Sequence, residues 1–338
     1  MKQIIRILAV LMAALLAVAV LASCDKKAGS AGAESNKSTE ATKPGSAEAT
    51  KPAGAGSEEV TPPSGSKGLE YYPLPDGTYA VSGGMTKYLT KVEIPAIHNG
   101  KAVTVITDRA FHEFPNLKKI TIPNSVTSIG ISAFWECSNL TSITIPDSVT
   151  SIGGGAFCGC SSLTNVTIPN GVTSIGYSAF ESCSSLTSIM IPDSVKIIDE
   201  GMFAYCSSLT SITLPSSVTS LGEFVFRGCS SLTSISIPDG VTSIGDFAFK
   251  NCSSLTSITI PNGVTGIGDG TFSDCPRLVS ITIPKSVTSI DYLAFSGCSN
   301  LTNITYTGTK AQWKACSKEY LGWSGTVTCS DGITSYNE

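Results

Sequence analysis

The hydrophobic positions of this 338-residue chain follow one repeated pattern over most of its length. After a phenylalanine, a leucine follows at six residues, a β-branched residue at nine and, in most copies, a proline at twelve. The phenylalanines stand 23 residues apart, at Phe111, Phe134, Phe157, Phe180, Phe203, Phe226, Phe249, Phe272 and Phe295. Self-similarity at a fixed period of this length predicts a repeat architecture.

Each repeat predicts the same short elements. In the copy 255–267, Ile258 and Ile260 alternate with a threonine, which is the pattern of a strand with one buried side. Pro261 ends this strand because proline has no N–H to donate to a sheet, and the following Asn-Gly pair is typical of a turn. A second extended stretch follows at 264–267, and the phenylalanine segment is expected to form a short helical turn.

The units must stack, because a single 23-residue unit is too small to bury its own apolar side. The pattern therefore predicts a repeat solenoid of nine 23-residue coils with a parallel sheet over residues 111–306. Residues 69–110 are expected to form an N-terminal cap with a degenerate first repeat. Residues 307–338, with Trp313 and Trp323, are expected to form a C-terminal cap.

The N-terminal residues predict export and attachment to a membrane. Lys2 and Arg6 precede an apolar run at 7–22, which is short for a membrane-spanning helix and typical of a signal peptide over residues 1–23. The run ends in Leu-Ala-Ser-Cys24, which resembles the lipobox of bacterial lipoproteins, so Cys24 is the expected lipidation site. Residues 24–68 are rich in Ala, Gly, Ser, Thr and Pro and are expected to form a disordered tether.

Composition narrows the classes of function. The net charge is −4, and the chain has no basic stripe of the kind that binds nucleic acid. His98 and His112 are the only histidines, so the sequence offers little material for a histidine-based catalytic site or metal site. We therefore expect a protein that is not an enzyme and that needs no cofactor or metal.

Most of the 12 cysteines also keep the 23-residue period. They are Cys137, Cys160, Cys183, Cys206, Cys229, Cys252, Cys275 and Cys298, with Phe114 in the equivalent place of the first unit. In-register side chains on neighbouring coils lie about 4.8 Å apart, whereas the Cβ atoms of a disulfide lie about 3.5–4.5 Å apart. The column is therefore predicted to hold free, buried thiols.

Three other cysteines leave the pattern. Cys158 follows Phe157 and is expected to be partly exposed, where a thiol nucleophile would still need a base that the sequence does not show. Cys316 and Cys329 in the C-terminal cap either pair or pack separately.

The positions that vary between copies are the better candidates for recognition. Aromatic residues flank the repeated phenylalanine at Trp135, Tyr177, Tyr205, Phe224, Phe247 and Tyr292, and acidic residues accompany them at Glu200, Glu223, Asp246 and Asp269. Aromatic and charged side chains of this kind form interface hot spots, although such rings also fold back on a neighbouring coil. The outward strand positions are mostly Thr and Ser, which suit a soluble sheet face or a flat lattice for ice or a glycan.

The repeat closely resembles the BspA-like, treponemal-type leucine-rich repeats of bacterial surface antigens. The resemblance rests on the unit Ile-Gly-x-x-Ala-Phe-x-x-Cys-Ser-Ser-Leu-Thr-Ser-Ile-Thr-Ile-Pro and covers about residues 76–333. The segment 98–106 resembles the family's lead into its repeats, and 306–332 resembles its exit. The resemblance implies a leucine-rich-repeat β-solenoid, secreted or anchored at the surface of a bacterial cell envelope.

The resemblance also implies a class of function, because several family members are adhesins that bind host matrix proteins or other bacteria. We therefore expect a lipid-anchored surface protein that binds a protein or glycoprotein partner and contacts the membrane through Cys24. The alternative is a structural or scaffolding protein of the cell envelope.

Overall fold

A computed structural model of the chain describes residues 65–336. The predicted signal peptide, the lipidation site Cys24 and most of the predicted tether lie outside the described residues. The described part comprises the repeats and their two ends.

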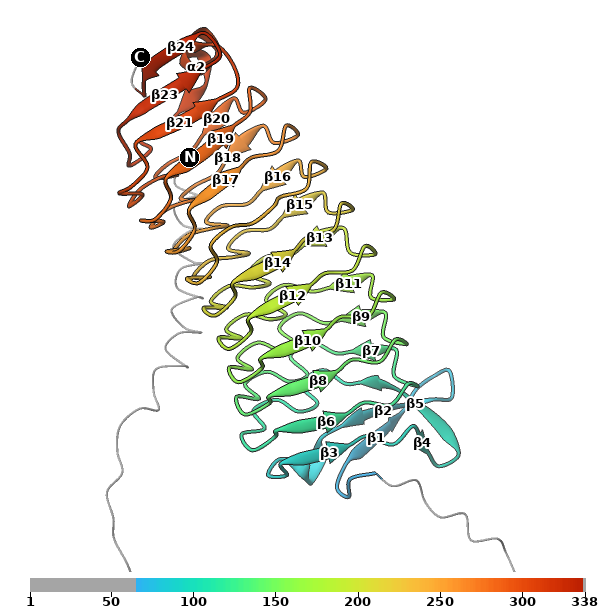
Figure 1. Ribbon diagram of the computed structural model, residues 1–338. Helices are drawn as coiled ribbons and strands as arrows, with labels where there is room; N and C mark the ends of the chain where they lie inside the picture. Colours follow the sequence, from blue (N-terminus) through green and yellow to red (C-terminus); the bar gives the residue numbers. More distant parts are fainter. Residues whose placement is uncertain (1–64, 337–338) are drawn as a thin grey trace, which may run out of the picture. The chain divides into compact units, whose positions relative to one another are not determined.

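A first ladder of short parallel strands lies along the stack in chain order, divided into three hydrogen-bonded sheets (Figure 1). Its members are β3 (Lys91–Glu93), β6 (Lys119–Thr121), β8 (Ser142–Thr144), β10 (Asn165–Thr167), β12 (Ser188–Met190), β14 (Ser211–Thr213), β17 (Ser257–Thr259), β19 (Ser280–Ile283), β21 (Asn303–Tyr306) and β23 (Thr326–Cys329). Equivalent residues pair between coils, as Ile189 does with Ile212. In β12 and β14 this middle residue is buried and its two neighbours are exposed, as the alternation predicts.

A second ladder of still shorter parallel strands forms another side of each coil. It consists of β5 (Lys101–Ile106), β7 (Ser128–Ile129), β9 (Ser151–Ile152), β11 (Ser174–Ile175), β13 (Ile197–Ile198), β15 (Ser220–Leu221), β16 (Ser243–Ile244), β18 (Gly266–Ile267), β20 (Ser289–Ile290) and β22 (Ser317–Lys318). In the central repeats each of these strands ends on a buried aliphatic residue, such as Ile198 or Leu221. Apolar residues from both ladders thus meet inside the coil.

The repeated phenylalanines form a continuous stack inside the solenoid. All nine rings from Phe111 to Phe295 are fully buried. Neighbouring rings lie nearly parallel, with centroids 5.3–5.8 Å apart. Burial of each ring contributes about 1.5–3 kcal/mol, and stacking adds to it.

The predicted leucine-rich β-solenoid is confirmed, and its strand ladder extends one coil further at each end. β3 pairs with β6 before the first phenylalanine repeat, and β23 pairs with β21 after the last. The phenylalanine segments form successive hydrogen-bonded turns: the N–H of Trp135 donates to the carbonyl of Ser132, and that of Cys137 donates to Phe134.

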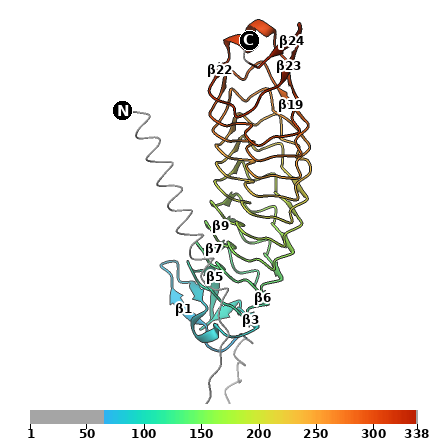
Figure 2. The same cartoon turned by 90° about the vertical axis from the view of Figure 1, so that its left-hand side faces the viewer.

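Both ends of the stack are covered (Figure 2). At the N-terminal end, β1 (Glu70–Pro73) pairs antiparallel with β2 (Tyr79–Ser82). β2 pairs parallel with β5, and β4 (Ile97–His98) pairs antiparallel with β5. The 3-10 turn η2 (Gly84–Thr86) follows β2. At the C-terminal end, the helix α2 (Lys310–Ala315) brings Trp313 into the core, and β24 (Gly332–Ser335) pairs antiparallel with β23.

A single hydrophobic core runs from Val81 to Cys329 without interruption. The repeats and both caps contribute to it, so residues 65–336 form one compact unit with a core of its own. Across residues 65–336, no helix is long and apolar enough to cross a bilayer.

Candidate protein-binding edge

The turn segments around the repeated phenylalanines form one edge of the solenoid. We call it the turn edge, and it covers the positions from three before to two after each phenylalanine. The backbone there is bonded from coil to coil: the N–H of Phe224 donates to the carbonyl of Asp246 at 2.9 Å, and that of Phe226 donates to Ala248 at 2.8 Å. The main chain thus holds the turn edge together, and its outward side chains are free to differ between coils.

Two positions of the turn edge adopt left-handed backbone conformations in every repeat. They lie two residues before and two residues after the phenylalanine, and glycine occupies six of these places: Gly155, Gly159, Gly201, Gly228, Gly270 and Gly297. Phe224 and Phe247 stand at the first position with φ of 56° and 57°. A bulky residue costs about 1–2 kcal/mol in this conformation, so these rings stand where glycine fits better.

An aromatic and cationic cluster occupies the middle of the turn edge. The Arg227 guanidinium lies 5.4 Å from the Tyr205 ring centroid and 5.5 Å from that of Phe224. The rings of Phe224 and Phe247 stack with centroids 5.3 Å apart, and Lys250 lies over Phe247 at 5.6 Å. We call these five residues the Arg227 cluster. All five are partly buried, so each presents part of its surface to solvent.

The charges around the cluster are only partly balanced. The Nε of Arg227 is buried and has no hydrogen-bond partner among the described residues. Burial raises the pKa of Glu181, and the nearby Arg227 charge works in the opposite direction. Lys250 lies 3.8 Å from Asp274. The Arg227 guanidinium therefore lies against two aromatic rings, and its Nε has no hydrogen-bond acceptor among the described residues.

An acidic column runs beside the cluster, three positions before the phenylalanine of successive coils. It comprises Glu200, Glu223, Asp246 and Asp269. The N–H of Asp269 donates to Asp246 Oδ1 at 3.0 Å, and the N–H of Tyr292 donates to Asp269 Oδ1 at 3.0 Å. Burial raises the pKa of Asp246, and repulsion from Asp269 adds to this. Within residues 65–336, no group of three His, Cys, Asp or Glu side chains is placed to hold a metal ion.

The six aromatic residues predicted for recognition all lie on the turn edge, but they do not form one site. Tyr205, Phe224 and Phe247 join the Arg227 cluster. Trp135 stacks on His112 with centroids 6.2 Å apart, whereas Tyr292 tilts toward Tyr320 at 6.0 Å. Tyr177 and Tyr292 are exposed, and Trp135 is half-buried.

Several of these rings cover a glycine of a neighbouring coil. A Cβ on Gly228 would lie 2.7 Å from the Tyr205 ring, and one on Gly270 would lie 2.5 Å from the Phe247 ring. Tyr177 covers Gly154 and Trp135 covers Gly155 in the same manner. Each of these rings therefore packs one face on a neighbouring coil, as the alternative interpretation predicts, and presents the remainder of its surface to solvent.

Sequence reasoning missed Arg227 and Lys250 as members of the cluster. Both occupy the position directly after the phenylalanine. The rings that they cover stand at other positions of the repeat, two residues before or two residues after the phenylalanine. A signal was available in the sequence: an aromatic residue is followed 23 residues later by a glycine, as Tyr205 is by Gly228. This pattern indicates a ring that lies over the neighbouring coil.

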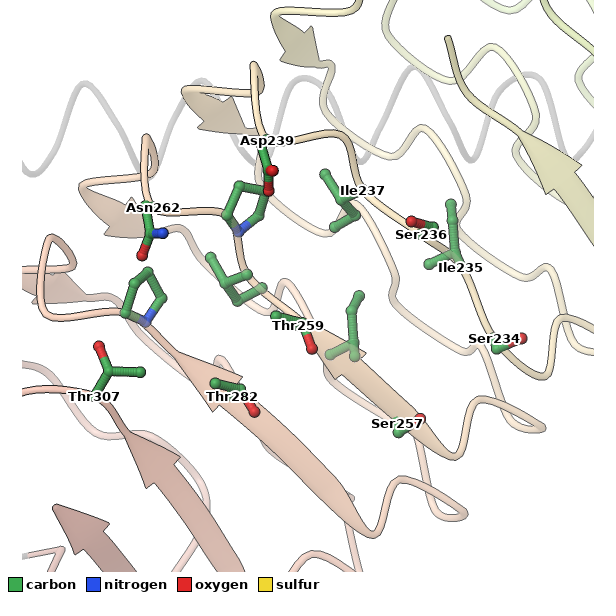
Figure 3. Close-up of a pocket in the computed structure, with 14 residues that line it drawn as sticks. Ser234, Ile235, Ser236, Ile237, Asp239, Ser257, Thr259, Asn262, Thr282 and Thr307 are labelled. Carbon is green, nitrogen blue, oxygen red and sulfur yellow. The ribbon is translucent and has the colours of Figure 1, made fainter. Parts of the chain in front are cut away.

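The Ser/Thr face of the solenoid holds a shallow hollow of about 540 Å³ (Figure 3). It lies where the 234–237 segment interrupts the first strand ladder. Hydroxyl groups of Ser234, Ser257, Thr259 and Thr282 line it, together with the rings of two prolines. Isoleucines also line it, and Ile235 is only half-buried here whereas the equivalent Ile212 and Ile258 are buried, so the hollow exposes more apolar surface than the rest of the face.

The cysteine column is buried and unbonded, as predicted. Each thiol donates a hydrogen bond to the phenylalanine carbonyl of the preceding coil, as Cys206 does to Phe180 at 3.1 Å. Burial raises the pKa of Cys206 to about 12. Cys316 and Cys329 are also free, so they pack separately. The expectation of a partly exposed Cys158 was wrong, because its side chain is buried beneath the turn edge.

These features define the class of protein as a leucine-rich repeat solenoid, which is built to present extended surfaces. The model of the BspA type leucine rich repeat region matches residues 85–210 and 196–317, in six copies. The chain belongs to this family. Leucine-rich repeat proteins are typically not catalytic, and membership favours a role in protein binding.

Solved structures of bacterial leucine-rich repeat proteins resemble this chain. One from Bacteroides ovatus is 29% identical over 71% of this chain and 70% of its own, with a TM-score of 0.58. A leucine-rich cell surface protein from Faecalibacterium prausnitzii is 28% identical over 77% and 99%, with a TM-score of 0.47. A Treponema pallidum leucine-rich repeat protein is 26% identical over 71% and 91%, with a TM-score of 0.42. A search among curated proteins gives no match.

Proposed function

We propose that this protein is a non-enzymatic, lipid-anchored surface protein of a bacterial envelope that binds a protein or glycoprotein partner through its turn edge. The observation that carries the proposal is the Arg227 cluster. Phe224 and Phe247 occupy left-handed positions that glycine occupies in neighbouring coils, so packing alone does not require aromatic residues there. Aromatic residues and arginine are the side chains most enriched in binding hot spots.

Export and anchoring are supported by the sequence. The charged start, the apolar run and Cys24 at its end have the order expected of a lipoprotein signal. Mass spectrometry of the mature N-terminus tests this part, and we expect acyl chains on Cys24. An unmodified Cys24 would contradict the anchor while leaving the binding role untouched.

The binding role is tested with residues 65–338 against a panel of matrix glycoproteins and bacterial cells. We expect binding to at least one member of the panel. The double variant Phe224→Gly and Phe247→Gly should weaken that binding at least tenfold, because it removes the stacked pair. It should still fold, since glycine occupies the same position at Gly201 and Gly270.

Met190→Ala provides the matched control. Met190 is exposed on the Ser/Thr face, away from the turn edge, so its loss should leave affinity unchanged. Binding that survives the double glycine variant would remove the Arg227 cluster from the proposal. Capture only of proteins from the bacterium's own envelope would favour the scaffolding role over adhesion.

A further inference from the structure

Met85 and Tyr88, the two most exposed apolar side chains of the described residues, lie close together at the N-terminal end of the stack with the exposed Leu89 beside them. Met85 is 87% exposed, Tyr88 75% and Leu89 41%. All three lie in or directly after η2, within one stretch of five residues. The inward side of the same stretch seals the core: Thr86 is buried, its hydroxyl donates to the Gly83 carbonyl at 2.6 Å, and Gly83 packs against Phe114.

Burial divides this stretch into an inward and an outward side. Thr86 is buried, whereas Met85 before it and Tyr88 after it are exposed. Closing the core therefore leaves Met85 and Tyr88 facing solvent. We call Met85, Tyr88 and Leu89, together with Lys91, Lys118 and Lys119, the N-terminal surface.

Lysines lie on the strands that adjoin this stretch, Lys91 in β3 and Lys119 in β6, with Lys118 directly before β6. The N–H of Lys118 donates to the Thr90 carbonyl at 2.9 Å, and Lys119 pairs in register with Lys91. The Asn116 amide also reaches the Tyr88 carbonyl, at 3.4 Å. Among the described residues, no carboxylate lies within 4.0 Å of the Lys118 or Lys119 ammonium groups.

The charge of this end differs from that of the repeats. Residues 65–119 carry seven Lys and Arg against five Asp and Glu, a balance of +2. Residues 120–296 carry five against twelve, a balance of −7. An anionic surface would therefore attract the N-terminal end and repel the remainder of the solenoid.

The chain also leads to this end from the predicted anchor. Gly65 and Ser66 are the first described residues, and the Ser66 N–H donates to the Glu93 carbonyl of β3 at 2.9 Å. β3 and β1 lie at the same end of the stack (Figures 1 and 2). Cys24 lies about 40 residues earlier in the sequence.

From these observations we infer that the N-terminal surface rests on an anionic lipid bilayer. Exposed Met, Tyr and Leu side chains would enter the headgroup region, and Lys118 and Lys119 would meet lipid phosphates, whereas Lys91 is already paired with Glu93 at 2.6 Å. The position of the bilayer rests on the lipid anchor of the proposed function. The contact itself comes from described residues and is tested without that anchor.

The test is flotation of residues 65–338 with vesicles of phosphatidylcholine alone or with about 30% phosphatidylglycerol. We expect binding to the anionic vesicles only, and its loss at about 0.5 M salt. Lys118→Ala with Lys119→Ala should lower partitioning on the order of 25-fold, since each lysine near an anionic surface contributes about fivefold. Met85→Ser with Tyr88→Ser should lower it as well.

Lys310→Ala with Lys314→Ala is the matched control, because both lysines are exposed on α2 at the other end of the stack. This pair should not change flotation. Equal recovery with neutral and anionic vesicles, no recovery with either, or an equal loss in the control pair would each overturn the inference. Because the fragment lacks Cys24, such a failure leaves the lipid anchor standing, and a failed anchor leaves this result standing.

Discussion

The interior columns and the turn edge of this solenoid share one period but differ in what the period preserves. Inside, the same position holds phenylalanine in all nine repeats, because each ring must fit the ring above and the ring below. On the turn edge, one position holds residues as different as Ser178, Gly201, Phe224 and Leu293, although the backbone angles stay alike. The difference shows that coil-to-coil main-chain hydrogen bonds keep the turn-edge backbone alike whatever residue stands there, whereas side-chain packing sets the residue type in the interior.

The turn edge is nevertheless not free of constraint. A long side chain in one coil often leans over a glycine in the next, as Tyr205 does over Gly228 and Glu136 does over Gly159. A residue there is thus coupled to the coil beside it rather than to the core. Variation proceeds in neighbouring pairs, and this is how a repeat protein makes a local site on a regular scaffold.

Removing one interior ring is the most direct test of the difference between the interior and the turn edge. Phe203 lies between Phe180 and Phe226, with both centroid distances at 5.8 Å. Phe203→Ala should lower the free energy of unfolding by about 3–5 kcal/mol, because it leaves a cavity in the middle of the stack. Denaturant unfolding of residues 65–338 measures this change.

The control removes a ring of similar size from the turn edge. Tyr177→Ala should cost about 1 kcal/mol or less, since Tyr177 is exposed and only covers Gly154. Equal costs for the two variants would show that the turn edge supports the fold as strongly as the interior does.

The regular part of this fold follows from the sequence because each column repeats its own chemistry. The coil that β3 adds falls in the expected degenerate first repeat, but its register does not follow from the period, since Val92 pairs with Ile120 at a separation of 28 residues instead of 23. The β4–β5 hairpin is inserted between them and hides the period. The break at 234–237 is hidden too, because its Ser-Ile-Ser-Ile resembles the Ser-Ile-Thr-Ile of paired strands.

The candidate site was predictable only in part for a related reason. Its aromatic members interrupt columns of small residues, so Phe224 and Phe247 stand out in the aligned repeats. Arg227 joins them by reaching across from another column, which requires the relative positions of neighbouring turns. Contacts between columns depend on this geometry, and a one-dimensional period does not contain it.

A smaller loss of stability is expected from changes in the cysteine column, whose buried thiols donate hydrogen bonds to main-chain carbonyls. Cys206→Ala removes the hydrogen bond to the Phe180 carbonyl and a small buried volume. The carbonyl keeps its bond from the Cys183 N–H, so the cost should be about 1 kcal/mol by denaturant unfolding.

The neighbouring serine sharpens this prediction. Ser207 bonds the carbonyl of Ser184 at 3.4 Å from a half-buried position, so Ser207→Ala should change stability by less than about 0.5 kcal/mol. If Cys206→Ala is as mild as Ser207→Ala, the thiols contribute volume alone and their hydrogen bonds add nothing.

The smallest expected effect has the opposite sign and belongs to the turn edge. The pKa of Asp246 is raised in the folded protein, by burial first and by the Asp269 carboxylate second. The folded state therefore holds this proton more tightly than the unfolded state, and stability falls as pH rises through the raised pKa. Asp246→Asn should increase stability at pH 7 by a few tenths of a kcal/mol, because the half-exposed site is screened by solvent.

The amide keeps an oxygen to accept the Asp269 N–H, so the variant changes charge more than structure. The gain should vanish near pH 3, about the range where the native carboxyl is already protonated. Asp193→Asn, in the exposed turn after β12, should show no such gain. A stabilisation of Asp246→Asn that persists unchanged in acid would mean that the acidic column is held by packing, as the interior is, and not strained by charge.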